Sequence, residues 1–219
     1  MDEPHAPAPD AKRSDDSGED ARGDATPEED DARPVEGTIV PPEEMACRAR
    51  LSELGVRFQT RPPELDDADC PLPFPVSMET LGAGIAIEPA ALVNCATAEA
   101  TARFAQEHVA PLASELLGSG LTTVRQVSGY VCRPRRGTDT ISEHATGNAI
   151  DFGGFVLEDG REIAASKTQD VKVGRFFARL RHAACGPFKT VLGPGTDADH
   201  ADHFHFDLAE RRNGSTYCR

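Results

Sequence analysis

The stretch Ser142-Glu143-His144-Ala145-Thr146-Gly147-Asn148-Ala149-Ile150-Asp151 carries the residues around which we expect the chain to fold. A neutral imidazole and a carboxylate are two of the ligand types that a catalytic zinc accepts, and His144 and Asp151 supply one of each. Asp151 lies in an apolar run, where an unpaired carboxylate is costly to desolvate, and a bound dication is a sufficient reason for its presence. Gly147 permits the positive φ that a tight turn between them needs.

A second stretch, Asp202-His203-Phe204-His205-Phe206-Asp207, follows some fifty residues later. Side chains alternate between the two faces of a strand, so the two histidines share one face and the two phenylalanines share the other. The phenylalanines can then bury against a core and present the histidines to a cleft. An isolated H-x-H is usually a solvated strand face, but one site built from both stretches would offer three protein ligands and an open metal position.

The N-terminal part of the chain differs in composition from the rest. Residues 1–44 contain 15 of the 37 Asp and Glu and 4 of the 23 Lys and Arg, so most of the formal charge of −14 lies there. This segment is rich in Pro, Ala and Gly and has almost no large apolar residues, which predicts a disordered tail acting as a tether or spacer. The remaining residues, 45–219, are enough for one domain with a core, and they show no basic patch of the kind that binds nucleic acid.

The cysteines indicate an oxidising compartment. All six are widely spaced and none forms a C-x-x-C pair, which favours structural disulfides over a Cys-rich zinc module. We expect Cys185 to pair with Cys218, because these two flank the second stretch. No run of about 18 apolar residues could span a membrane. We therefore expect an exported protein of the periplasm, cell envelope or extracellular space, whose targeting segment is not in this sequence; the oligomeric state is not indicated.

Periodicity and turn residues predict the order of the elements. A helix from Pro42 to Leu54 comes first, 61–75 is irregular, and short strands at 76–80 and 84–87 precede a long helix that opens at Pro89 and ends or kinks at Pro111. Strands follow at 121–131 and 149–157, the second with a hairpin partner at 161–165. A helix at 171–184, with Val171 among its core-facing residues, precedes strands at 188–192 and 203–208. This order predicts an α+β fold, with an antiparallel central sheet, helices packed on one side, and disulfides for stability.

Several segments together resemble a known family. SEHATGNAIDFGGF, TVLGPGTDADHADHFHFDLA, the run Ser128-Gly129-Tyr130-Val131-Cys132-Arg133 and the terminal Tyr217-Cys218-Arg219 are similar to the bacterial extensin-like C-terminal domain family, over roughly residues 45–219. The pattern of the two central stretches is also similar to the D-Ala-D-Ala carboxypeptidase group of zinc peptidases. The H-x-H pair looks like the wider lysostaphin and hedgehog-type arrangement.

The resemblance implies a zinc ion held by His144, Asp151 and His205, with water in the fourth position. The residue that takes the proton of this water is open between two candidates. The D-Ala-D-Ala group implies Asp202, whereas the lysostaphin-like group implies His203. Regular strand alternation puts Asp202 opposite His205 and favours His203, but a strand that begins only at His203 would let Asp202 turn inward.

Three further residues are candidates for supporting roles. Arg133 matches a region where the related peptidases hold a substrate carboxylate, a task that suits the planar guanidinium, although a surface arginine in a basic turn would look the same. Ser142 is a second candidate for substrate contact. Asp207 is expected to orient His205 or His203 from behind, unless it is only a strand-end carboxylate. His200 either lines the cleft or occupies a loop.

These features lead to two hypotheses for function. The first is a zinc metallopeptidase that hydrolyses an amide bond in peptidoglycan peptides and so takes part in cell-wall remodelling. The alternative is a zinc-stabilised, non-catalytic module that binds a cell-wall polymer or a protein partner. A mononuclear iron oxygenase ranks below both, because six residues separate His144 from Asp151 where such enzymes use a tight H-x-D.

Overall fold

The structure is a computed structural model that describes residues 39–166, 168 and 170–219. Most of the tail predicted to be disordered, residues 1–38, lies outside the described residues. The first element is helix α1, Pro42–Glu53, which starts with a proline at its N-terminal end, has Glu43 and Glu44 in its first turn, and is followed by Gly55 at φ 72°. Proline and acidic residues suit a helix start and glycine suits its end, so the predicted helix is confirmed.

Within the described residues, nine strands form one sheet in the order β1-β2-β3-β4-β5-β8-β7-β9, and β6 pairs with β5 beside this path. The strands are β1 Phe58–Thr60, β2 Val76–Gly82, β3 Ile85–Val93, β4 Leu121–Ser128, β5 Ala149–Leu157, β6 Glu162–Ala164, β7 Thr190–Leu192, β8 Phe204–Asp207 and β9 Tyr217–Cys218. The hairpin of β5 and β6 is the one predicted from the sequence. The last predicted strand, 203–208, is followed by β9, so it does not end the sheet.

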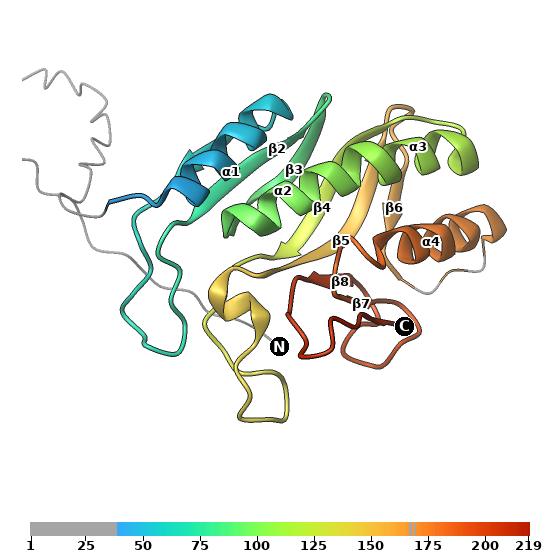
Figure 1. The fold of residues 1–219 in the computed structure, drawn as a ribbon. Coiled ribbons are helices and arrows are strands. Elements are labelled where there is room, and N and C mark those ends of the chain that lie inside the picture. The colour runs from blue at the N-terminus through green and yellow to red at the C-terminus, as the bar shows by residue number, and fades with distance from the viewer. Residues whose placement is uncertain (1–38, 167, 169) are drawn as a thin grey trace, which may run out of the picture. The chain divides into compact units, whose positions relative to one another are not determined.

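The helices cover one face of this sheet (Figure 1), as predicted. A long helical segment runs through α2, Cys95–Phe104, and α3, Ala110–Leu112, with π-helical turns at Ala105–Val109 and Ala113–Leu117. The helix therefore continues past Pro111. Proline has no amide hydrogen to donate, and the π-helical turns on either side accommodate this gap in the hydrogen-bond pattern. Helix α4, Val171–Ala184, has the predicted bounds, but Val171 is 74% exposed and does not face the core as expected.

The sheet is mixed, which corrects the prediction of an antiparallel sheet. Strands β3 and β4 are parallel, and so are β7 and β9, whereas the other pairs are antiparallel. Parallel neighbours need a long crossover connection, and the helical segment from α2 to Leu117 provides it. The predicted order of two short strands, a helix and a further strand is compatible with this crossover, although the sheet was expected to be antiparallel.

The predicted helix start at Pro89 is wrong, because residues 89–93 belong to β3. Helix α2 begins only after Asn94, whose side chain accepts a hydrogen bond from the Thr97 amide at 2.8 Å. Asparagine is a favoured N-cap because its side-chain oxygen satisfies an amide that has no partner inside the helix. Pro89 itself lies where the register between β2 and β3 shifts, so no regular ladder bond is required from its nitrogen.

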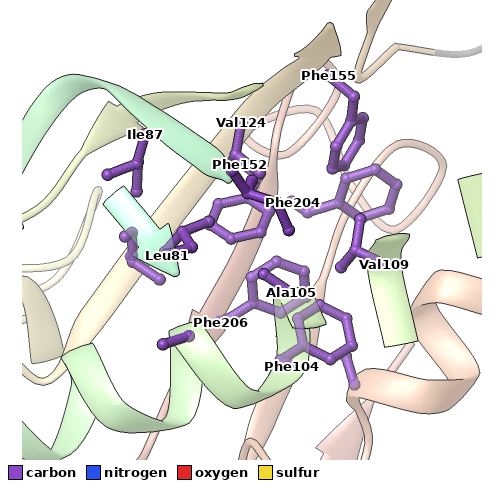
Figure 2. Close-up of a cluster of buried hydrophobic side chains, with 14 of the residues drawn as sticks. Leu81, Ile87, Phe104, Ala105, Val109, Val124, Phe152, Phe155, Phe204 and Phe206 are labelled. Atoms are coloured by element: carbon purple, nitrogen blue, oxygen red, sulfur yellow. The ribbon is translucent and has the colours of Figure 1, made fainter. Parts of the chain in front are cut away.

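The core lies between the helices and the strands and contains most of the phenylalanines. Figure 2 shows Phe152, Phe204 and Phe206 of the sheet facing Phe104 of α2. Each of these four side chains is at most 1% exposed, and Phe104 and Phe206 meet edge to face with ring centroids 5.5 Å apart. This face of β5 and β8 is thus fixed by apolar burial, and their other face is free to carry polar side chains.

Three disulfides join distant parts of the described chain: Cys47–Cys95, Cys70–Cys132 and Cys185–Cys218. The last is the predicted pair. Among the described helices, none has both the length and the apolar character that a membrane span requires.

Candidate metal centre

Strands β5 and β8 bring the two central stretches together. They are antiparallel neighbours, and in their register Asp151 lies opposite His205 while Phe152 lies opposite Phe204. Because side chains alternate along a strand, burial of the phenylalanines against the helices sends Asp151 and His205 to the other face of the sheet. The expected separation of the two faces is confirmed.

His144 reaches the same place from a short 3₁₀ helix, Glu143–Thr146. Ser142 caps this helix, with its hydroxyl 3.4 Å from the amide nitrogen of His144. Gly147 ends it at φ 64°, and a Cβ atom there would lie 2.7 Å from the backbone nitrogen of Asn94. Only glycine fits both the left-handed backbone and the close approach, so the local turn depends on this residue.

The three side chains converge on one point. His144 Nε2 lies 3.2 Å from Asp151 Oδ2 and 3.2 Å from His205 Nδ1, and His205 Nδ1 lies 2.9 Å from Asp151 Oδ1. Their exposed fractions are 1%, 4% and 9% for His144, Asp151 and His205. A tetrahedral ion with ligand bonds of about 2.0 Å holds its ligand atoms about 3.3 Å apart, so the spacing and the N, N, O donor set both fit zinc.

The outer nitrogen of each histidine is occupied, which decides which nitrogen faces the shared point. His144 Nδ1 donates to the Gly129 carbonyl at 2.7 Å, and His205 Nε2 donates to Asp207 Oδ2 at 3.1 Å. Metal-bound histidines in general use their second nitrogen in this way, which fixes the ring and its tautomer. Asp207 is 3% exposed and contacts His205, which is one of the two histidines that it was expected to orient.

The same contacts shift the ionisation of the buried groups. Burial disfavours a charged Asp151, but hydrogen bonds from His144 and His205 outweigh this effect and hold the pKa of Asp151 well below its usual range. Burial likewise disfavours a protonated His205, yet the carboxylates of Asp151 and Asp207 raise the pKa of His205 to about 9. The centre is thus strongly attractive to a positive charge.

His203 and Asp202 lie next to this group and contact each other. His203 Nδ1 donates to Asp202 Oδ1 at 3.0 Å, and His203 Nε2 lies 3.8 Å from Asp151 Oδ2. The side chain of His203 is 18% exposed, whereas that of Asp202 is 87% exposed. Strand β8 begins at Phe204, yet Asp202 does not turn inward. The two candidates for the base therefore stand in series, with His203 nearer to the three converging side chains.

A cavity of about 1200 Å³ opens over this group. Arg133 lines it, is exposed, and makes no side-chain hydrogen bond or ion pair with the residues that the structure describes. Ser142 also borders the cavity, but it is only 7% exposed and its hydroxyl serves as the helix cap. Of the two residues predicted to contact a substrate, Arg133 is thus the one whose side chain has no hydrogen-bond or ion-pair partner among the described residues.

One contributor to the site was not predicted from the sequence, and a second was left open. The Gly129 carbonyl is a backbone group, and a backbone contact of this kind cannot be predicted from a pattern of side chains. His200 lines the cavity, and its partner Asp197 lies three residues earlier, a spacing that suits a side-chain contact within a turn. The sequence left His200 between the cleft and a loop, and in the structure it belongs to the cleft.

Comparison with protein families gives one match, to the family described as the extensin-like protein C-terminus, over residues 45–219. The chain belongs to this family. The comparisons with curated proteins and with solved structures found no match. The matched residues contain all three disulfides and every residue of the candidate metal centre. The extensin-like domain and its disulfides are consistent with the predicted export of the protein.

Proposed function

We propose that this extensin-like chain is a zinc metallopeptidase that hydrolyses an amide bond in peptidoglycan peptides. The observation that carries the proposal is the buried convergence of His144, Asp151 and His205 under a large cavity, beside a third histidine, His203, that is not part of the converging group. A purely structural zinc site is closed by four protein ligands, whereas a catalytic one leaves a position for water or substrate. Three protein donors at an open cavity correspond to the second type.

When bound, zinc supplies a Lewis acid that polarises a carbonyl and lowers the pKa of a bound water to about 7. The protein must then accept the proton. His203 suits this role because Nδ1 is engaged by Asp202, so the neutral ring has its lone pair on Nε2, which lies 3.8 Å from Asp151 Oδ2. Asp202 contributes by holding the ring and its tautomer, as carboxylates do behind catalytic histidines.

The cavity supports a peptide as the substrate. Its volume of about 1200 Å³ exceeds the ~300–1000 Å³ of ordinary small-molecule sites, and it has room for several peptide residues. Arg133 offers a guanidinium without a partner among the described residues, which suits a substrate carboxylate. Peptidoglycan peptides carry such carboxylates; another acidic cell-wall polymer is the related alternative.

Digestion of purified muropeptides, followed by mass analysis of the products, tests the proposal. We expect one zinc per chain and release of peptide fragments that stops with a chelator and returns on adding zinc. His144→Ala should lose both the metal and the activity, whereas His203→Ala should keep the metal and lose the activity.

A zinc-loaded protein that binds sacculi without forming any product, with unchanged binding after His203→Ala, would instead support the non-catalytic binding module. A folded protein that takes up no zinc would contradict both functions.

A further inference from the structure

His200 lines the cavity, but the proposed zinc peptidase mechanism gives it no role. It lies in the loop between β7 and β8, and two contacts to one carboxylate oxygen hold it. Its backbone amide donates to Asp197 Oδ1 at 3.0 Å, and its Nδ1 donates to the same oxygen at 2.7 Å. Since both the backbone and the ring are tied to Asp197, the ring has one preferred orientation.

The ring lies near His203 and His205 without joining the proposed metal ligands. Its centroid is 5.3 Å from that of His203 and 5.8 Å from that of His205, and its side chain is 20% exposed. Within the described residues, the converging group that includes His205 contains only His144 and Asp151 besides it. His200 therefore contacts the space above the metal position, where a substrate group would lie.

The contact with Asp197 also determines what His200 can offer. Because Nδ1 donates its hydrogen to the carboxylate, the neutral ring presents the lone pair of Nε2. Among the described residues, no side chain or backbone group hydrogen-bonds to this nitrogen. A fixed acceptor that has no partner among the described residues and borders the cavity can accept a hydrogen bond from a ligand there.

We propose that His200 is a substrate-contacting residue whose Nε2 accepts a hydrogen bond from the N–H of the amide at the metal centre. This inference rests on the proposed peptidase function. The carbonyl oxygen of that amide faces the metal, so the N–H is the nearest remaining polar group of the bond. His200 would then select amides over esters, which have the same shape but no N–H at this position.

A pair of analogues tests this contact through binding rather than turnover. The two probes share the sequence of the peptide bond that the wild-type protein cleaves in the muropeptide digest; one is the phosphonamidate, with P–NH, and the other the phosphonate ester, with P–O. Calorimetry on the zinc-loaded full chain should show the phosphonamidate binding about 10-fold more tightly, the size of effect that one additional hydrogen bond provides. His200→Phe keeps a ring in this position but removes the acceptor, and should abolish the difference.

Two further variants complete the experiment. Asp197→Ala leaves His200 in place but unanchored and should reduce the difference between the analogues only in part. His182→Phe, on an exposed position of α4, is the matched histidine control and should behave as wild type. Zinc content is measured for each variant to show that the metal centre is intact.

The outcomes separate the two proposals. Absence of any muropeptide cleavage would overturn the proposed function and this inference together. Cleavage by the wild type with equal affinity for both analogues, or an undiminished difference in both His200→Phe and Asp197→Ala, would overturn this inference alone.

Discussion

At the scale of single residues, each histidine of the centre is defined by what its outer nitrogen contacts. His144 is held by a carbonyl, while His205, His203 and His200 are each held by a carboxylate. These contacts occupy one nitrogen of each ring, and the four rings differ in where the remaining nitrogen lies. His144 and His205 belong to the converging group, whereas His203 and His200 line the cavity beside it, so in the proposed function metal binding and substrate chemistry would fall to different rings.

The serial arrangement of Asp202 and His203 predicts unequal losses of activity. His203→Ala should lower kcat by about 10²–10⁴-fold, the usual range for a general base. Asp202→Ala leaves the imidazole in place and should lower kcat by about 10–100-fold, as for other supporting carboxylates. Both variants should keep one zinc per chain, because neither residue is among the three ligands. Steady-state kinetics with zinc analysis measures both effects, and a larger loss in Asp202→Ala would identify Asp202 as the base.

The raised pKa of His205 predicts how zinc binding depends on pH. In the metal-free protein this ring is protonated below a pKa of about 9, and a ligand must be neutral, so binding displaces one proton. Zinc affinity should therefore rise by about 10-fold per pH unit and level off near pH 9. Competition with a zinc-sensitive dye between pH 7 and pH 9 measures the slope. Asp207→Asn removes one carboxylate that raises this pKa, and it should move the plateau to lower pH.

The sequence predicted the residues of the centre better than their surroundings. His144, Asp151 and His205 were expected to meet because the two stretches resemble those of zinc peptidases, and the alternating strand pattern and the carboxylate in an apolar run agree with that resemblance. The group that holds the ring of His144 could not be predicted, because Gly129 acts through its backbone carbonyl. Ser142 was predicted as a substrate contact but caps the helix of His144, because a serine before a helical turn has both uses.

At the scale of elements, the connection between β3 and β4 explains the main error in the predicted fold. A helix placed from Pro89 hides the second half of β3, and without that half the parallel pairing with β4 is not evident. The apolar alternation of residues 85–93 is interrupted by exposed residues at a bulge, so the period of a strand is not continuous there. Elements with an unbroken pattern, β5 and α4, were predicted with their observed bounds.

The turn that carries His144 gives a prediction at this scale. Gly147→Ala forces a Cβ into a left-handed backbone and to within 2.7 Å of the Asn94 nitrogen. Gly160 serves as the matched control, because its φ is 82° and, apart from its two neighbours in the chain, none of the described residues lies within 4 Å of the position that a Cβ would take, so Gly160→Ala has the backbone cost alone. We expect a loss of about 1 kcal/mol in the free energy of unfolding for Gly160→Ala and about 3 kcal/mol for Gly147→Ala.

Zinc affinity separates the two glycine variants further. Displacement of the turn moves His144, so Gly147→Ala should bind zinc more weakly, whereas Gly160→Ala should bind it as the wild type does. Urea unfolding and zinc titration on both variants provide the measurements. Equal zinc affinities would show that the turn does not position the ligand.

At the scale of the whole domain, two of the three disulfides stabilise different parts of the fold. Cys47–Cys95 joins α1 to the start of α2, on the helical side of the sheet. Cys70–Cys132 instead joins the loop before β2 to the segment after β4, which carries Gly129 and Arg133. Tyr130 strengthens this second link, because its hydroxyl donates to the Cys70 carbonyl at 2.9 Å. The first bridge thus supports the core, and the second supports a segment that borders the candidate metal centre.

Removal of each bridge by a pair of alanines should therefore have similar effects on stability and different effects on metal binding. The bridged cysteines are 48 residues apart in Cys47–Cys95 and 62 apart in Cys70–Cys132. Because the loop-closure entropy depends only on the logarithm of loop length, opening either bridge should lower the free energy of unfolding by about 4 kcal/mol. Loss of Cys70–Cys132 also frees the segment whose Gly129 carbonyl fixes His144, so zinc affinity should fall by about 10–100-fold in this variant alone. Denaturant unfolding with excess chelator isolates the first effect and zinc titration the second; equal zinc affinities in the two variants would show that the bridge does not position the metal ligand.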